Sequence, residues 1–317
     1  MRRKPPRLRE LEGHEGFCCG TCDLLCEGTG QDRRSCSGRS GCLEWRCLRQ
    51  LACRTGWPRG SGSLKNARAG LPRARLPGSG EKAMEPFPRL LVLGDRGAPD
   101  VALENTLESL ARARAQGADG VKVDIRIAAD GVPVVIHDGT LQRTFGRREE
   151  VARITWPALQ QLTGARLPDL QQVAAWAAAS ESWLNVEIRA GGSEQTVVEI
   201  LRDHGLTERC FLSASDDAVL TKLGRIAPSV RRFLVAESWN EAVAERAAHC
   251  GVNGVCLRVD EASPFTIEVV RREGYAVAVW TVDDPAHSVT LAREGVAAII
   301  TNRPGEIAEA LIASGYR

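Results

Sequence analysis

The sequence from residue 84 onward predicts an α/β fold, a (β/α)8 TIM barrel with a small insertion after the second strand. Short apolar runs alternate there with amphipathic segments, which is the pattern of a parallel sheet wrapped by helices. Eight such runs occur between residues 89 and 313, and eight strands close a barrel. An open doubly wound sheet is the competing architecture. It is disfavoured because no Gly-x-Gly-x-x-Gly pattern follows the first run.

The expected elements follow one another along the chain. The apolar runs that we expect to form strands are residues 90–94, 120–127, 183–189, 210–214, 232–235, 254–258, 276–282 and 297–301. Helices are expected at 105–116, 168–179, 216–223, 239–250, 264–273 and 285–294, and a glycine directly follows four of them: Gly117, Gly251, Gly274 and Gly295. Ser263-Pro264 and Asp284-Pro285 have the form of helix starts, a cap followed by proline. The short apolar run 132–137 begins the insertion.

Residues 1–83 differ in composition from residues 84–317. They contain 17 Lys or Arg against 8 Asp or Glu, whereas the remainder contains 25 against 32. They also hold eight of the eleven cysteines and show no sustained hydrophobic period, so they offer little apolar surface to bury against the entropy of ordering. We therefore expect a disordered or adventitious basic, Cys-rich extension, with Met84 as the working start. A zinc module around Cys19-x-x-Cys22 and a basic nucleic-acid-binding tail are the alternatives.

Composition also limits the location and partners of the protein. No apolar run approaches 18 residues, which excludes a membrane span, and no secretory signal is recognisable. Cys210, Cys250 and Cys256 have the character of small buried residues in a reducing setting. We expect a cytoplasmic protein, and for residues 84–317, which are net acidic, we expect no nucleic-acid partner.

The residues with chemical potential gather at the predicted strand ends. Five strings between residues 94 and 144 contain most of them: Gly94-Asp95-Arg96-Gly97-Ala98, Leu103-Glu104-Asn105-Thr106, Lys122-Val123-Asp124, Ile136-His137-Asp138 and Leu141-Gln142-Arg143-Thr144. Further along, Asn185-Val186-Glu187-Ile188-Arg189 and Val279-Trp280-Thr281 lie on later strands. The carboxyl ends of barrel strands meet on one face, so these side chains should converge. A charged residue on a parallel strand is seldom a routine core residue, which favours a site over a scaffold role for Asp124 and Glu187.

In order and spacing, these strings resemble the glycerophosphodiester phosphodiesterase family over essentially all of residues 89–313. The resemblance implies metal-dependent hydrolysis of glycerophosphodiesters to glycerol 3-phosphate and an alcohol. It assigns Asp124 and Glu187 to metal ligands, with Glu104 beside the metal, and His137 to one of two acid-base histidines. It places Arg96 at the phosphate, and Arg189 and Trp280 are further substrate-binding candidates. His137 as a loop cap and Trp280 as core packing are the structural alternatives.

Two positions depart from the family pattern. Asp95 stands where the family has its first catalytic histidine, and Lys122 stands where it has a metal-ligand glutamate. An ammonium has no lone pair for a metal and repels it, so we expect Mg²⁺ or Ca²⁺ to bind weakly or not at all. A carboxylate is a poor base near neutrality. We expect an ion pair between Asp95 and Lys122 across the barrel, with the ammonium roughly where the metal would be.

Three functions remain open from the sequence. The first is a family hydrolase whose activity is weak or lost. The second is a non-catalytic barrel that binds a small phosphodiester or another phosphorylated ligand. The third is an active enzyme with Asp95 as the base, which requires a metal that Lys122 opposes. Fold resemblance cannot decide among them, because function resides in the site.

Overall fold

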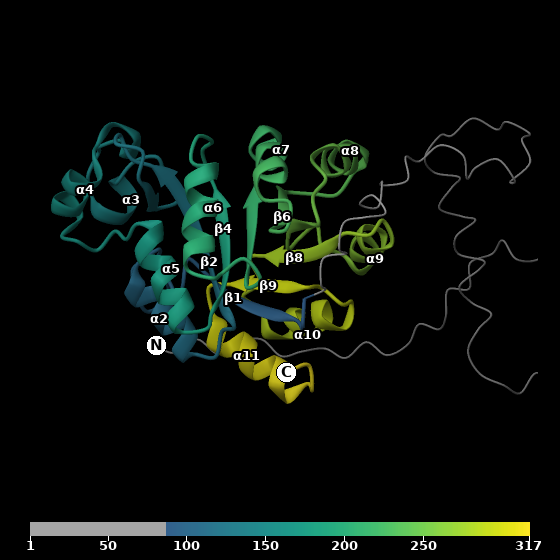
Figure 1. The fold of residues 1–317 in the computed structure, drawn as a ribbon. Helices are drawn as coiled ribbons and strands as arrows, with labels where there is room; N and C mark the ends of the chain where they lie inside the picture. The colour runs from purple at the N-terminus through teal and green to yellow at the C-terminus, as the bar shows by residue number, and fades with distance from the viewer. Residues whose placement is uncertain (1–86) are drawn as a thin grey trace, which may run out of the picture. The chain divides into compact units, whose positions relative to one another are not determined.

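The computed structural model describes residues 87–317, which form a closed (β/α)8 barrel (Figure 1). The expectation for residues 1–83 lies outside the described residues. The strands are β1 (Leu91–Asp95), β2 (Gly120–Ile127), β4 (Trp183–Ile188), β5 (Cys210–Ala214), β6 (Arg231–Ala236), β7 (Gly254–Arg258), β8 (Ala276–Trp280) and β9 (Ala298–Thr301). They are parallel and pair in the order β1-β9-β8-β7-β6-β5-β4-β2, and β1 also pairs with β2, which closes the barrel. The predicted fold class is confirmed.

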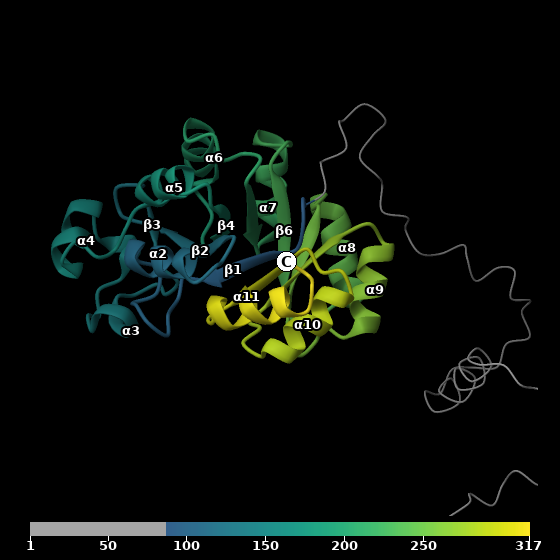
Figure 2. The same cartoon turned by 90° about the horizontal axis from the view of Figure 1, so that it is seen from below.

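The helices form the outer layer of the barrel. They are α2 (Leu107–Ala115), α5 (Leu170–Ala179), α6 (Glu194–Asp203), α7 (Asp217–Ile226), α8 (Glu241–Cys250), α9 (Pro264–Arg272), α10 (Pro285–Arg293) and α11 (Pro304–Ala313). Figure 2 shows α5 to α11 arranged around the strands. The two predicted starts are present: Ser263 accepts a hydrogen bond from the Thr266 N–H, and Asp284 accepts hydrogen bonds from the N–H groups of Ala286 and His287.

The insertion after the second strand folds beside β2 as a small layer of its own. It contains β3 (Pro133–Val135), α3 (Gln142–Phe145), a 3₁₀ turn η1 (Val151–Arg153) and α4 (Trp156–Thr163). β3 runs antiparallel to β2. A separate apolar cluster, which includes Ile136, Leu141 and Leu159, fills the insertion, so the insertion has a small core of its own.

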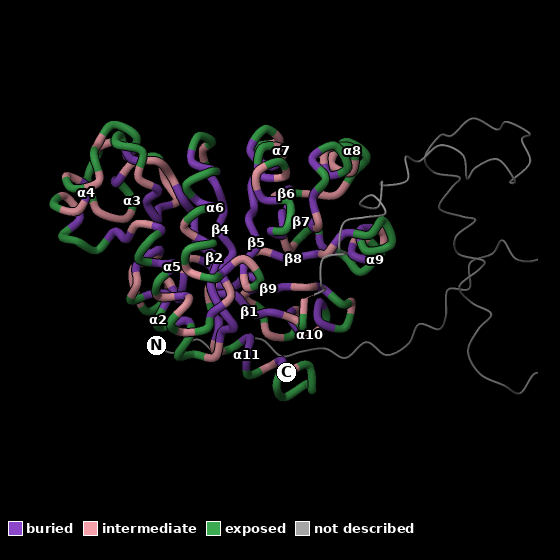
Figure 3. The backbone as a smooth tube through the Cα atoms, in the orientation of Figure 1, coloured by how far each residue is buried: buried purple, intermediate pink, exposed green. Residues whose placement is uncertain are grey.

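Burial follows the barrel geometry, with buried strands inside and helices exposed on their outer faces (Figure 3). The large cluster between sheet and helices includes Val121, Leu184 and Leu212. Inside the barrel, Phe211 and Phe233 pack with ring centroids 4.7 Å apart, together with Leu91 and Leu93. The interior is therefore filled at that level, and polar side chains gather toward the C-terminal ends of the strands, called here the barrel mouth.

Several boundaries differ from those predicted. Helices α4, α6 and α11 were not predicted, and β8 ends at Trp280 rather than at residue 282. The first helix begins at Leu107, because Thr106 caps it by accepting a hydrogen bond from the Ser109 N–H, and Asn105 has a left-handed φ of 56°. No helix among residues 87–317 combines the length and apolar character needed to cross a membrane.

Candidate functional site

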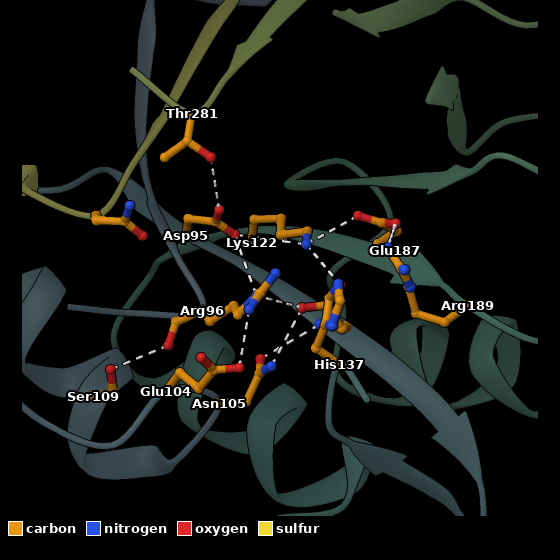
Figure 4. Close-up of polar contacts among 12 residues, drawn as sticks. Asp95, Arg96, Glu104, Asn105, Ser109, Lys122, His137, Glu187, Arg189 and Thr281 are labelled. Carbon is orange, nitrogen blue, oxygen red and sulfur yellow. Dashed lines mark hydrogen bonds and ion pairs between the residues drawn. The ribbon is translucent and has the colours of Figure 1, made fainter. Parts of the chain in front are cut away.

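The predicted site residues converge at the barrel mouth. A cavity of about 220 Å³ is lined by seven of the nine: Asp95, Arg96, Lys122, His137, Glu187, Arg189 and Trp280. The other two, Glu104 and Asp124, contact residues in its wall. Figure 4 shows Asp95 of β1, Lys122 of β2 and Glu187 of β4 close together, with four further predicted residues around them: Arg96, Glu104, His137 and Arg189.

The ammonium of Lys122 lies among three carboxylates. Its Nζ is 2.6 Å from Asp124 Oδ1, 2.9 Å from Glu187 Oε2 and 3.6 Å from Asp95 Oδ1. Only 8% of the Lys122 side chain is exposed. Burial disfavours its charged form, but Asp124, Asp95 and Glu187 outweigh burial and raise its pKa. The expected Asp95 pair is present, although the two shorter contacts are to the other carboxylates.

Strand register explains this cluster. Asp95 of β1 is the register partner of Lys122 on β2, and Asp124 is the partner of Glu187 on β4. Residues two apart on a strand point to the same face, so Lys122 and Asp124 both face inward. The Lys122 side chain then leans toward the mouth and meets both carboxylates of the next layer.

Asp124 is fully buried and held on three sides. Besides Lys122, it accepts a hydrogen bond from Asn105 Nδ2 at 3.3 Å and lies 3.1 Å from Arg96 Nε. Burial raises its pKa, but Lys122 and Arg96 outweigh that effect and lower it. The role of Asn105 was not predicted, although it belongs to one of the strings that define the resemblance. Its left-handed backbone turns its amide toward Asp124.

The turn after β1 positions Asp95 and Arg96. Arg96 has a φ of 58°, and its N–H donates to the Lys122 carbonyl at 2.8 Å. Gly97 follows with a φ of 97°, and a Cβ there would clash with Ser109. Asp95 Oδ2 accepts a hydrogen bond from Thr281 Oγ1 at 3.3 Å.

A chain of alternating charges ties His137 to the barrel. His137 Nδ1 is 2.7 Å from Asp138 Oδ1, and Arg143 Nε donates to Asp138 Oδ2 at 2.7 Å. The hydrogen bond from Arg143 is the largest influence on Asp138 and lowers its pKa to about 2. Arg143 also donates two hydrogen bonds to Glu104, which in turn accepts one from Arg96. Sequence reasoning missed the role of Arg143, because the contact joins residues 39 positions apart.

Arg189 and Trp280 complete the cavity wall. Arg189 Nη1 donates to Glu187 Oε1 at 2.6 Å, and 31% of the Arg189 side chain is exposed. Trp280 Nε1 donates to the Cys256 carbonyl at 3.2 Å, and its ring also packs on the barrel-interior cluster. Trp280 therefore combines core packing with a place in the cavity lining.

A model of the Glycerophosphoryl diester phosphodiesterase family matches residues 96–306, which is most of the described barrel. The chain belongs to this family. The glycerophosphodiester phosphodiesterase of Caldanaerobacter subterraneus subsp. tengcongensis is 26% identical over 236 residues, which cover 68% of this chain and 95% of that protein.

Solved structures of family proteins share the fold. A glycerophosphodiester phosphodiesterase from Thermotoga maritima is 26% identical with a TM-score of 0.62, and the match covers 70% of this chain and 98% of that one. A phosphodiesterase from Oleispira antarctica, solved in complex with the product sn-glycerol-3-phosphate, has a TM-score of 0.64 at 23% identity, covering 71% and 97% of the two chains.

The side chains at the mouth do not fit the divalent cation that the family resemblance implies. Asp124 and Glu187 both face the Lys122 ammonium, which repels a cation and donates no lone pair. Residues 87–317 contain no group of three or more His, Cys, Asp or Glu side chains placed to hold a metal ion.

Proposed function

We propose that this family member binds a phosphorylated glycerol-type ligand at the barrel mouth and lacks the metal-dependent hydrolysis that the family resemblance implies. The observation that carries the proposal is the position of Lys122 Nζ, 2.6 and 2.9 Å from the two carboxylates assigned to metal binding. The ammonium satisfies these carboxylates itself. No step of the proposed function therefore runs through a metal ion.

Ligand binding is supported by the cations that line the cavity. A guanidinium carries five N–H donors. Arg189 donates to Glu187 from one nitrogen, whereas Arg96 donates to Glu104 from Nη1 and its Nε lies 3.1 Å from Asp124. Both side chains are partly exposed, at 31% and 22%, and both line the cavity. Their remaining donors match the geometry of phosphate oxygens.

Loss of hydrolysis is supported by the acid-base groups. Transfer of a phosphodiester group needs a base for the attacking hydroxyl, an acid for the leaving group and a cation at the non-bridging oxygens. His137 is the one imidazole in the cavity wall among the described residues. Asp95 occupies the place of its partner and already neighbours two cations, Lys122 at 3.6 Å and Arg96 at 3.9 Å. The Asp95 carboxylate therefore faces two cations and supplies no second imidazole to the cavity.

The test combines binding and turnover in the full chain. Calorimetric titration with glycerol 3-phosphate in the presence of EDTA should show binding that Arg189→Ala weakens. Arg258→Ala is the matched control, because Arg258 also pairs with acidic residues but is more exposed and does not line the cavity. Glycerophosphocholine incubated with Mg²⁺ or Ca²⁺ should release no glycerol 3-phosphate. Metal-stimulated turnover, or the absence of binding, would contradict the proposal.

A further inference from the structure

The cavity floor contains two buried oxygen atoms that accept no hydrogen bond from residues 87–317. They are Asp95 Oδ1 and Asn185 Oδ1. Asp95 is 7% exposed and Asn185 is 1% exposed, and both line the cavity at the barrel mouth. Buried polar atoms in folded proteins almost always have a partner, and each unsatisfied one is destabilising. These two acceptors therefore require a hydrogen-bond donor from a ligand in the cavity.

Each acceptor is fixed in place by the other polar atom of its own side chain. Asn185 Nδ2 donates to Ser213 Oγ at 2.8 Å and to the Phe211 carbonyl at 3.2 Å, which leaves Oδ1 as its unsatisfied atom. Asp95 Oδ2 accepts from Thr281 Oγ1 at 3.3 Å, which leaves Oδ1. The closest cation to Asp95 Oδ1 is Lys122 Nζ, at 3.6 Å and outside hydrogen-bond distance.

The two acceptors lie deeper in the barrel than Arg189, one of the two cations that suit a phosphate. Asp95, Lys122 and Asn185 are successive register partners across β1, β2 and β4. Glu187 lies two residues beyond Asn185, which at the rise of a strand is roughly 7 Å toward the mouth, and Arg189 lies two residues beyond Glu187. The cavity therefore has two unsatisfied acceptors at its floor and the Arg189 guanidinium nearer its rim.

The geometry points to a hydroxyl-recognition subsite at this floor, formed by Asp95 and Asn185, so that the ligand is a phosphate ester with a free hydroxyl that enters hydroxyl-first. This inference rests on the proposed function. A hydroxyl suits the floor better than an ammonium does, because Lys122 already opposes the Asp95 charge. A phosphate does not suit it, because Asp95 repels an anion. The cavity volume of about 220 Å³ accommodates a short carbon chain between the two ends.

The first test compares two ligands on the unmodified full chain. Glycerol 3-phosphate and 1-propyl phosphate have the same phosphate and carbon chain, but only the first carries hydroxyls. Calorimetry in EDTA should show glycerol 3-phosphate binding roughly 10- to 100-fold more tightly, as expected for a hydrogen bond to a charged group. Equal affinities would overturn this inference and leave phosphate binding standing. If neither ligand binds, the proposed function fails, and this inference fails with it.

The second test uses variants, and the affinity ratio of the two ligands is its readout. Asp95→Ala also removes a charge that repels any anion, so absolute affinity alone is not informative. In Asp95→Ala and in Asn185→Ala the preference for glycerol 3-phosphate should fall to a few-fold. Asp260→Ala, which removes an exposed carboxylate outside the cavity, should keep the full preference. A preference that survives Asp95→Ala would refute the role of Asp95.

Discussion

Replacing Lys122 by methionine tests whether the ammonium takes the place of a metal ion. The substitution keeps an unbranched side chain of similar length but removes the charge that Asp124, Glu187 and Asp95 share. Removing one partner of a buried ion pair typically destabilises a protein by about 3–5 kcal/mol, because an uncompensated charge remains. In a barrel of this size that corresponds to a decrease in Tm of roughly 6–20 °C.

Divalent cations should reverse this loss in the variant. The two shorter distances around Nζ, 2.6 and 2.9 Å, lie within a few tenths of an ångström of the 2.3–2.6 Å typical of Ca²⁺ to oxygen. Once the ammonium is gone, Ca²⁺ can occupy the space between the carboxylates. At a concentration of about 100 Kd it should restore about 2.7 kcal/mol. The unmodified chain should gain nothing comparable.

The assay is thermal unfolding of the full chain, followed by circular dichroism with and without Ca²⁺. Arg153→Met is the control, because Arg153 also contacts a carboxylate, Glu150, at 2.8 Å, but the two side chains are 78% and 53% exposed. An exposed pair contributes up to about 1 kcal/mol. The reasoning is refuted if Lys122→Met unfolds within about 2 °C of the unmodified protein, or if Ca²⁺ stabilises both proteins equally.

Three further predictions concern activity, domain extent and pH. The double variant Asp95→His with Lys122→Glu should release glycerol 3-phosphate from glycerophosphocholine in the presence of a metal ion, at least about 10²-fold faster than either single variant. Adding His137→Ala should remove most of this activity. No turnover by the double variant would show that the site differs at further positions. We propose that a chain beginning at Met84 unfolds at the same temperature as the full chain; a decrease of many degrees would contradict this. The pKa of Asp138 falls from 3.8 to about 2 on folding, so the folded protein binds fewer protons there than the unfolded chain. The contribution of Asp138 to folding stability is therefore present above about pH 4 and lost toward pH 2. Tm should decrease over this pH range, and the decrease should be smaller in Asp138→Asn.

The sequence predicted the barrel because its signals are local and repeated. Glycine after four helices and a cap with proline at two starts fix boundaries within a few residues. Helix α6 was missed because Ser193 makes no side-chain capping bond and no proline follows it. Helix α11 was missed because Arg303, which precedes its first residue Pro304, is not a capping residue type and makes no side-chain capping bond.

The sequence predicted those contacts in the site that follow from the positions of residues at the strand ends. Residues placed by register on neighbouring strands, such as Asp95 and Lys122, were predicted to meet, and they do. The shorter contacts of Lys122 depend on which way a long side chain leans, and alternation along a strand does not specify that. Arg143 acts through the insertion, whose packing against the mouth has no periodic signal in the sequence.

The family resemblance implies two departures from the family pattern, Asp95 and Lys122, whose charges act on the same cavity. In this chain Asp95, Asp124 and Glu187 are negative and Lys122 is positive, which leaves two negative charges. With a neutral histidine at position 95, Asp124, Glu187 and Lys122 would together leave one negative charge. The site that the resemblance implies for the family has the same net charge, because a divalent ion among three carboxylates also leaves one negative charge. Asp95 therefore makes the floor of the cavity less favourable for an anion than the family's pattern would, and it places a fixed acceptor there. We therefore expect a phosphate to bind at Arg96 and Arg189 and away from Asp95, so Asp95→His alone should strengthen the binding of inorganic phosphate while weakening the preference for hydroxylated esters.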